Sequence, residues 1–198
     1  MKNTLKIIAF SFRRLLLSLL LAGILSSQSA DAYCLDLHIG ANLVSFYRLP
    51  EDISIDHVFS LSNEMITGII GEGVAASYIP ETGWVGSLEY IQAEDGYWLE
   101  ASYHINLCIP NAVPTGTELR YTLHEGSNLI SYPSRATLSL EEALPEGIEE
   151  NISGIIGEGV AAQYIENIGW MGSLTHFEGS RGYWIRTNES ITFTFNSH

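Results

Sequence analysis

The sequence predicts a mainly β protein made of two tandem homologous units, each a small β-sandwich or barrel-like fold with one short helix, after an N-terminal signal helix. Three observations predict it: the second half of the chain repeats the first, short apolar segments alternate with glycines, and the chain opens on a basic and then apolar stretch. The predicted organisation is a signal peptide at 1–32, unit one at 33–110, a linker at 111–119 and unit two at 120–198.

The signal peptide is predicted from the order of its residues. The basic pair Arg13-Arg14 precedes the apolar run Leu15–Leu25, and Ala30-Asp31-Ala32 is a small-residue cleavage site. A membrane anchor is the alternative, but this run is too short for a bilayer core of about 30 Å. We therefore expect no membrane insertion after cleavage, and a secreted, extracellular or cell-surface protein, with the periplasm as an open alternative.

The remaining chain is strongly acidic. Beyond residue 32 there are 22 Asp and Glu against five Arg and no Lys, a balance of −17. Such a charge excludes a nucleic-acid partner held through its phosphates. It fits an acidic solvated surface or, alternatively, the binding of Ca²⁺; no other cofactor is expected, and no residues lie at metal-ligand spacing.

The duplication is found by aligning the sequence with itself at an offset of 86 positions, which is the separation of Gly40 and Gly126. The recurring blocks are GANLVSF (40–46) and GSNLISY (126–132), GIIGEGVAA (68–76 and 154–162), GWVGSL (83–88) and GWMGSL (169–174), and GYWL (96–99) and GYWI (182–185). Similarity of this kind predicts two copies of one structural unit.

Within each unit, apolar alternation and glycine boundaries predict strands, and one capping pattern predicts a helix. A helix is expected from Ser139, followed by Glu142 as a capping box, to Pro145, with its counterpart at 54–59. The strands expected in unit one are 42–46, 66–70, 74–79, 84–88, where Gly86 lets a neighbouring strand approach, 97–101 and 105–109.

Both cysteines, Cys34 and Cys108, lie beyond the signal peptide. In an oxidising compartment an even count predicts a disulfide, with two free thiols as the alternative. The bridge would join the first strand of unit one to its last, so those strands should be neighbours. Unit two carries Arg120 and Thr194 at the matching places.

The segment Gly71–Ala76 matches the G-x-G-x-x-A fingerprint of dinucleotide binding. That fingerprint needs a helix after the glycines, whereas Pro80 and Gly83 follow too soon for one that could cross a sheet. The glycines are therefore predicted to form a turn or bulge between two strands.

Two acidic and two basic side chains occupy equivalent places. Two alternatives are open for Glu72 and Glu158: a carboxylate pair for glycoside hydrolysis or Ca²⁺ binding, or two acids that lie far apart. His38 and His124 begin equivalent strands and are predicted to be structural. No catalytic residue or metal ligand is assigned.

The aromatic residues provide the main binding hypothesis. The candidates are Trp98 and Trp184, with Tyr97 and Tyr183 beside them. The two-residue period of a strand places Trp98 on the face of Glu100 and Trp184 on that of Arg186. A Trp on this polar face could stack on a sugar ring or enter a partner surface; alternatively it covers the core.

In their order, the four blocks resemble a repeated β module of bacterial secreted and cell-surface proteins, over nearly all of 37–109 and 123–195. The resemblance implies accessory or tandem units on exported proteins and no established catalytic residues.

The sequence therefore favours a secreted, non-catalytic binding or adhesion protein that recognises an extracellular glycan or protein. The alternatives are a structural or assembly subunit of an extracellular complex, and a small extracellular hydrolase that uses Glu72 and Glu158.

Overall fold

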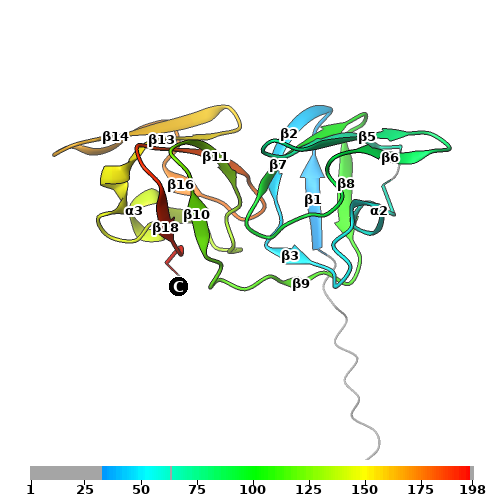
Figure 1. Cartoon of the computed structure of the whole chain (residues 1–198), viewed down its shortest axis with the longest axis horizontal. Helices are drawn as coiled ribbons and strands as arrows, with labels where there is room; N and C mark the ends of the chain where they lie inside the picture. The colour runs from blue at the N-terminus through cyan, green and yellow to red at the C-terminus, as the bar shows by residue number, and fades with distance from the viewer. Residues whose placement is uncertain (1–32, 63, 197–198) are drawn as a thin grey trace, which may run out of the picture. The chain divides into compact units, whose positions relative to one another are not determined.

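A computed structural model describes residues 33–62 and 64–196, which fall within the unit Ala32–His198. The signal peptide predicted at 1–32 lies outside the described residues. Figure 1 shows strands throughout this unit, and the prediction of a mainly β fold is confirmed.

Two five-stranded antiparallel sheets have the same internal order. The first runs β2-β7-β4-β5-β6 and the second β11-β17-β13-β14-β15, so each strand of one has an equivalent in the other. The first sheet comprises β2 (Gly40–Ser45), β4 (Ile66–Ile70), β5 (Ala75–Ile79), β6 (Gly83–Gly86) and β7 (Gly96–Ala101). The second comprises β11 (Gly126–Ile130), β13 (Ile152–Gly157), β14 (Val160–Ile165), β15 (Gly169–Gly172) and β17 (Tyr183–Thr187). Residues 33–109, which hold the first sheet, are called the first half below, and residues 121–195 the second half.

Short two-stranded pairs complete each half. They are β1 (Tyr33–Leu37) with β8 (Ile105–Ile109), β10 (Tyr121–Leu123) with β18 (Ile191–Phe193), β3 (Arg48–Leu49) with β9 (Val113–Pro114), and β12 (Leu138–Ser139) with β16 (His176–Phe177). Because β9 lies in the segment predicted as a linker, the first part of that segment is attached to the first half.

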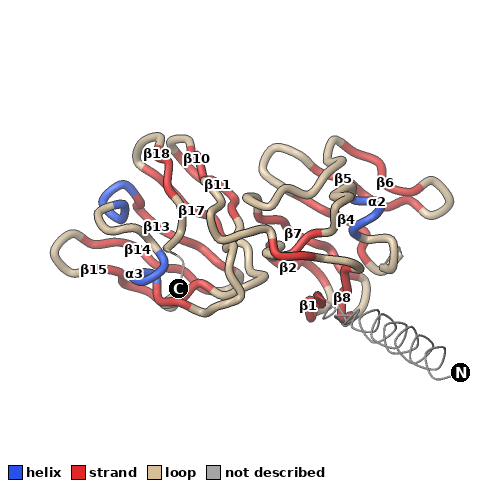
Figure 2. The backbone as a smooth tube through the Cα atoms, turned by 90° about the horizontal axis from the view of Figure 1, so that it is seen from below, coloured by secondary structure: helices blue, strands red, loops and turns tan. Residues whose placement is uncertain are grey.

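Each half has one short α-helix, drawn in blue in Figure 2, and the second half adds a 3-10 turn. These elements are α2 (Ile55–Val58), α3 (Leu140–Ala143) and η1 (Ile148–Asn151). The predicted capping box is confirmed, since the Glu142 amide donates to Ser139 Oγ at 3.2 Å while the Ser139 amide donates to the Glu142 carboxylate at 3.1 Å. Among the described residues, no helix is long and apolar enough to cross a bilayer.

Strand alternation divides each sheet into an inner and an outer face. On β7, Tyr97, Leu99 and Ala101 are buried in the first core together with apolar residues of β1 and β8. On β17, Tyr183 and Ile185 occupy the same places in the second core. The alternate residues of both strands lie on the opposite side, called the outer face below.

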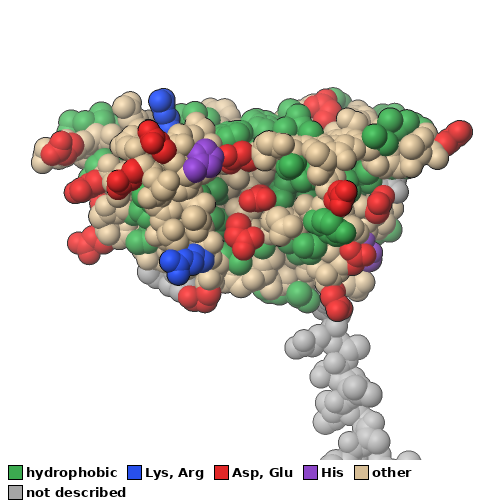
Figure 3. Space-filling view, in the orientation of Figure 1, with side chains coloured by type: hydrophobic (Ala, Val, Ile, Leu, Met, Phe, Trp, Pro, Cys, Tyr) green, Lys and Arg blue, Asp and Glu red, His purple; other side chains and the backbone are tan. Residues whose placement is uncertain are grey.

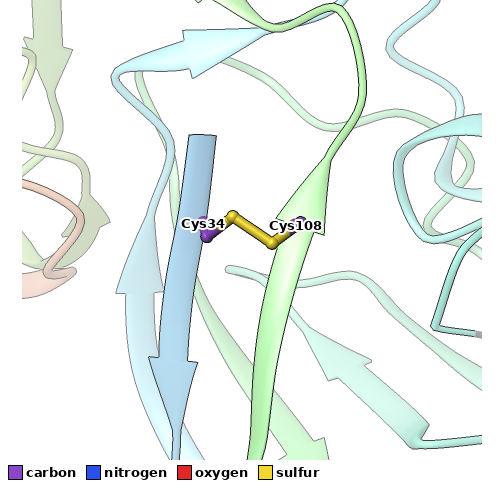
Figure 4. Close-up of a disulfide and its surroundings, with 2 residues drawn as sticks. All are labelled: Cys34 and Cys108. Carbon is purple, nitrogen blue, oxygen red and sulfur yellow. A yellow bond between two sulfur atoms is a disulfide. The ribbon is translucent and has the colours of Figure 1, made fainter. Parts of the chain in front are cut away.

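The predicted disulfide is present (Figure 4). Cys34 on β1 faces Cys108 on β8, with Cα atoms 4.0 Å apart and 74 positions apart in the chain. It joins the first and last strands of the first half, as the sequence predicted.

The Gly-Glu-Gly segments form the turns between β4 and β5 and between β13 and β14. Gly73 and Gly159 have φ of 72°, a conformation that favours glycine. No helix follows either turn, so the prediction of a turn between strands is confirmed. The close approach at Gly86 is confirmed too, because a Cβ there would lie 2.1 Å from the Ala75 carbonyl oxygen.

Candidate functional site

The two halves contact each other through equivalent backbone groups, and this contact is called the seam below. The Ser45 amide donates to the Ser180 carbonyl oxygen at 3.0 Å, and the Ser131 amide donates to the Glu94 carbonyl oxygen at 2.8 Å. Adding 86 to Ser45 and Glu94 gives Ser131 and Ser180. Each bond is therefore the counterpart of the other under exchange of the halves, which is the pattern of a two-fold interface.

Two leucines pack across the seam in the same reciprocal way. Leu43 and Leu129 are buried on the outer faces of their sheets, apart from the two main cores. A Cβ placed on Gly182 would lie 3.1 Å from Leu43 Cδ1, and one on Gly96 would lie 2.9 Å from Leu129 Cδ1. Glycine at these two places lets each leucine reach the backbone of the other half.

Glu72 and Glu158 extend from equivalent turns into the opposite half. Glu72 accepts from the Leu129 amide at 2.8 Å and contacts His124 Nε2 at 2.6 Å. Glu158 accepts from the Leu43 amide at 2.9 Å and contacts His38 Nε2 at 2.5 Å. Each carboxylate thus uses one oxygen for a backbone amide and the other for a histidine ring.

The two histidine rings are placed to donate from both nitrogens. Nδ1 of His38 lies 2.8 Å from the Ile39 carbonyl oxygen, and Nδ1 of His124 lies 2.7 Å from that of Glu125. A carbonyl oxygen only accepts, so Nδ1 must carry a proton, and donation to a carboxylate requires a second proton on Nε2. The geometry therefore fits the imidazolium form of both rings.

The seam contacts change the pKa values of its groups. Glu158 and then the Ile39 carbonyl raise the pKa of His38, and the Glu125 carbonyl and then Glu72 raise that of His124. Burial raises the pKa of Glu158, but the hydrogen bonds from His38 and the Leu43 amide outweigh burial and lower it overall. The raised pKa values of the two histidines and the lowered pKa of Glu158 all favour the charged forms of these side chains.

These shifts predict how the free energy of unfolding depends on pH. A raised histidine pKa stabilises the fold fully below pH 6.5, and this contribution is lost as the pH rises through the folded-state value. The lowered pKa of Glu158 stabilises the fold above pH 4.5, and that contribution is lost as the pH falls through its folded-state value. We expect the seam to be most stable between these limits.

The measurement is urea unfolding from pH 4 to pH 9 of the native chain and of the double variant His38→Asn/His124→Asn. The variant should lose less stability than the native chain above pH 6.5. His104→Asn is the matched control, because His104 is an exposed histidine 3.7 Å from Asp36 and away from the seam. If the free energy of unfolding depends on pH in the same way in the native chain and the double variant, the charged histidine–glutamate contacts at the seam are contradicted.

Trp98 and Trp184 lie on the outer faces, as the two-residue period predicted. Both side chains are half-buried, and neither belongs to a main core. Trp98 is paired across the sheet with Leu43 and Ile70, and Trp184 with the equivalent Leu129 and Ile156. Each indole is therefore flanked by an aliphatic side chain on both neighbouring strands.

Other aliphatic side chains are exposed on these faces. Ile70 and Ile156 are 56% and 54% exposed, so the strand beside each Trp leaves more than half of its isoleucine open to solvent. The exposed aliphatic side chains of the outer faces are Ile70, Ile79, Val85, Ile156, Ile165 and Met171. Hydrophobic side chains reach the surface along the upper rim in Figure 3, over strands of the two large sheets, and acidic side chains lie among them and over the rest of this view.

Tyr97 and Tyr183 are predicted to bind ligand beside the tryptophans, but the structure places them on the opposite faces of the sheets from Trp98 and Trp184. They are 1% and 2% exposed, on the inner faces. The Gln92 amide donates to the Tyr97 hydroxyl, and the Glu178 amide to the Tyr183 hydroxyl, each at 2.8 Å. Burial raises the pKa of Tyr183 to about 12 and that of Tyr97 further, so both phenols stay neutral and serve the core.

The Glu72 and Glu158 carboxylates have a structural role at the seam, which the sequence did not predict. The hydrolase stays an untested alternative, in which each carboxylate would first have to leave its amide and its histidine. Among residues 33–62 and 64–196, no group of three or more His, Cys, Asp or Glu side chains could hold a metal ion. The sequence showed only that His38 and His124, and likewise the two glutamates, are equivalent at a spacing of 86 residues; it did not show that they meet across the halves.

Comparison of the chain with protein-family models, with curated proteins and with solved structures found no match.

Proposed function

We propose that this chain is a secreted, non-catalytic binding protein that attaches to an extracellular glycan through the outer faces of its two large sheets. The observation that carries the proposal is the equivalent placement of Trp98 and Trp184, both half-buried, on faces that do not form a core. A half-exposed indole on a flat sheet can stack on the apolar face of a sugar ring. Two such platforms on one chain would bind a polymer with an affinity above that of either alone.

The proposed location outside the cytoplasm, in the medium, at the cell surface or in the periplasm, is supported by two features. One is the basic and apolar N-terminal stretch of the sequence, and the other is the disulfide between Cys34 and Cys108. Disulfides persist in oxidising compartments and are rare in the cytosol.

A structural or assembly subunit is the second candidate, favoured by one observation. The outer faces expose aliphatic side chains as well as the indoles, and exposed Ile70 and Ile156 suit a protein partner better than a sugar.

The test is a glycan array followed by a pull-down with insoluble polysaccharide, using Trp98→Ala, Trp184→Ala and the double variant. Each single change should weaken binding about tenfold, because a truncated aromatic anchor loses most of its contact area. Tyr103→Ala is the matched control, since Tyr103 is 64% exposed but lies outside the sheets.

Equal retention of the native chain and the double variant would contradict the proposed site. If no glycan is retained and the chain instead elutes as an assembly, Ile70→Lys with Ile156→Lys should dissociate it. That outcome would favour the assembly subunit over the glycan-binding protein.

A further inference from the structure

The second half contains a cavity of about 280 Å³ at the seam, beside the Glu158 and His38 contact. Its apolar wall is formed by Val160, Leu174 and the edge of the buried Tyr183 ring. Its polar groups are His38, Glu158, His176, Glu178 and Arg181. A concave site with a mostly apolar wall and a few convergent polar groups is typical of small-ligand binding.

The duplication supplies an internal comparison for this cavity. The residues that shape it are equivalent in the first half: Val74 matches Val160, Leu88 matches Leu174 and Tyr97 matches Tyr183. The charged residues of the cavity loop are different. His176, Glu178 and Arg181 stand where the first half has Tyr90, Gln92 and Asp95. The two halves therefore share the apolar residues that shape the cavity but differ in the charged and polar residues that line it.

Arg181 has unused hydrogen-bonding capacity. Its side chain is half exposed, and its only ion pair within 4.0 Å in the described part of the chain is with Glu158 Oε2, at 3.7 Å. That oxygen already accepts from the Leu43 amide. Across residues 33–62 and 64–196 the guanidinium donates no hydrogen bond, so its planar set of donors is open to a ligand. This set matches a carboxylate with two parallel hydrogen bonds.

The local charge permits an anion although the whole chain is acidic. Arg181 and the imidazolium of His38 balance Glu158 and Glu178, whereas the equivalent places in the first half carry His124 against Glu72 and Asp95, with no arginine. At physiological ionic strength the Debye length is about 8 Å, so the groups of the cavity itself dominate a ligand seated in it.

We propose that this cavity binds a carboxylate-bearing sugar residue, a uronic acid unit of a polysaccharide, with its carboxylate on Arg181. The sugar hydroxyls would meet the Glu178 carboxylate and His176 Nε2, while its C–H face would lie against Leu174 and Val160. This rests on the proposed function, glycan binding, and names the class of sugar that the second half selects.

The probe is a trigalacturonate, compared by calorimetry with its fully methyl-esterified form, in which a neutral methyl ester replaces each charged carboxylate. The acid should bind at least tenfold more tightly than the ester. Arg181→Gln and Arg181→Asp should each remove this difference; the second restores the residue type of Asp95. Arg120→Gln, on another exposed arginine, and Asp95→Asn, at the equivalent place in the first half, are controls that should leave it unchanged.

Absence of acid binding, equal affinity for acid and ester, or an unchanged preference in Arg181→Gln would each overturn the inference. Its failure is distinguishable from failure of the proposed outer-face site. If polysaccharide retention needs Trp98 and Trp184 but the acid and the ester bind equally well, the inference is overturned and the outer-face site stands. Acid binding that needs Arg181, together with polysaccharide retention that survives both Trp substitutions, overturns the outer-face site alone.

Discussion

Cys34→Ser/Cys108→Ser is expected to lower the free energy of unfolding by about 4 kcal/mol, the loop-closure estimate for a bridge between residues 74 positions apart. The bridge joins β1 to β8; β1 contributes tyrosine and leucine side chains to the first core, and β8 contributes Leu107 and Ile109. Without it, the unfolded first half gains conformational freedom that folding must then remove. Urea unfolding of the oxidised native chain and the variant measures the difference.

The second half provides the control for this experiment. Its equivalent strands β10 and β18 pair without a bridge, and Arg120 and Thr194 stand at the places of the cysteines. Arg120→Ser/Thr194→Ser should therefore change the urea midpoint little. A loss below about 1 kcal/mol in the cysteine variant would show that β1 and β8 are held by core packing alone.

Gly96→Ala/Gly182→Ala is expected to loosen the seam and to cost about 1–3 kcal/mol for each alanine. A Cβ on Gly96 would lie 2.7 Å from the Ile130 carbonyl oxygen, and one on Gly182 would lie 2.6 Å from that of Val44. Both obstacles are backbone atoms, which cannot rotate aside, so the two halves must move apart. Urea unfolding gives the cost, and amide hydrogen exchange at Ser45 and Ser131, which donate across the seam, reports the opening.

Gly68→Ala is the matched control for the seam glycines. Gly68 also lies in a large sheet, but a Cβ there would have its nearest neighbour at 3.5 Å, an ordinary contact. Slow exchange of the Ser45 and Ser131 amides in the seam variant, as in the control, would contradict the close packing of the halves.

Several elements could be predicted because their determinants are local. The short apolar run Ile66–Ile70 and the closing segment Ile105–Ile109 were predicted as strands with the bounds that the structure shows. The capping box at Ser139 needed only residues three positions apart. The neighbouring positions of Cys34 and Cys108 followed from an even cysteine count and from their places in the first and last strands.

For the aromatic residues, the local sequence pattern was not sufficient to predict which side chains are buried. A two-residue period separates Trp98 from Tyr97, but it does not say which face is the core, because both faces carry apolar side chains. Tyr97 belongs to the core that β1 and β8 share, whereas Trp98 lies beside Ile70 on the outer face. Only the packing of β1 and β8 on one side decides that the tyrosines are buried and the tryptophans remain half exposed.

By itself, the sequence determined the duplication, the strands, the glycine turns and the cysteine pairing, because each depends on residue types at short or repeating spacing. Only the tertiary structure decided that Glu72 and Glu158 each cross to the other half and meet His124 and His38, and that Arg181 borders a cavity. Equivalent positions in two copies say nothing about how the copies dock. Docking depends on surfaces assembled from residues far apart in the chain, and here it rests on the space that Gly96 and Gly182 leave for the backbone of the opposite half.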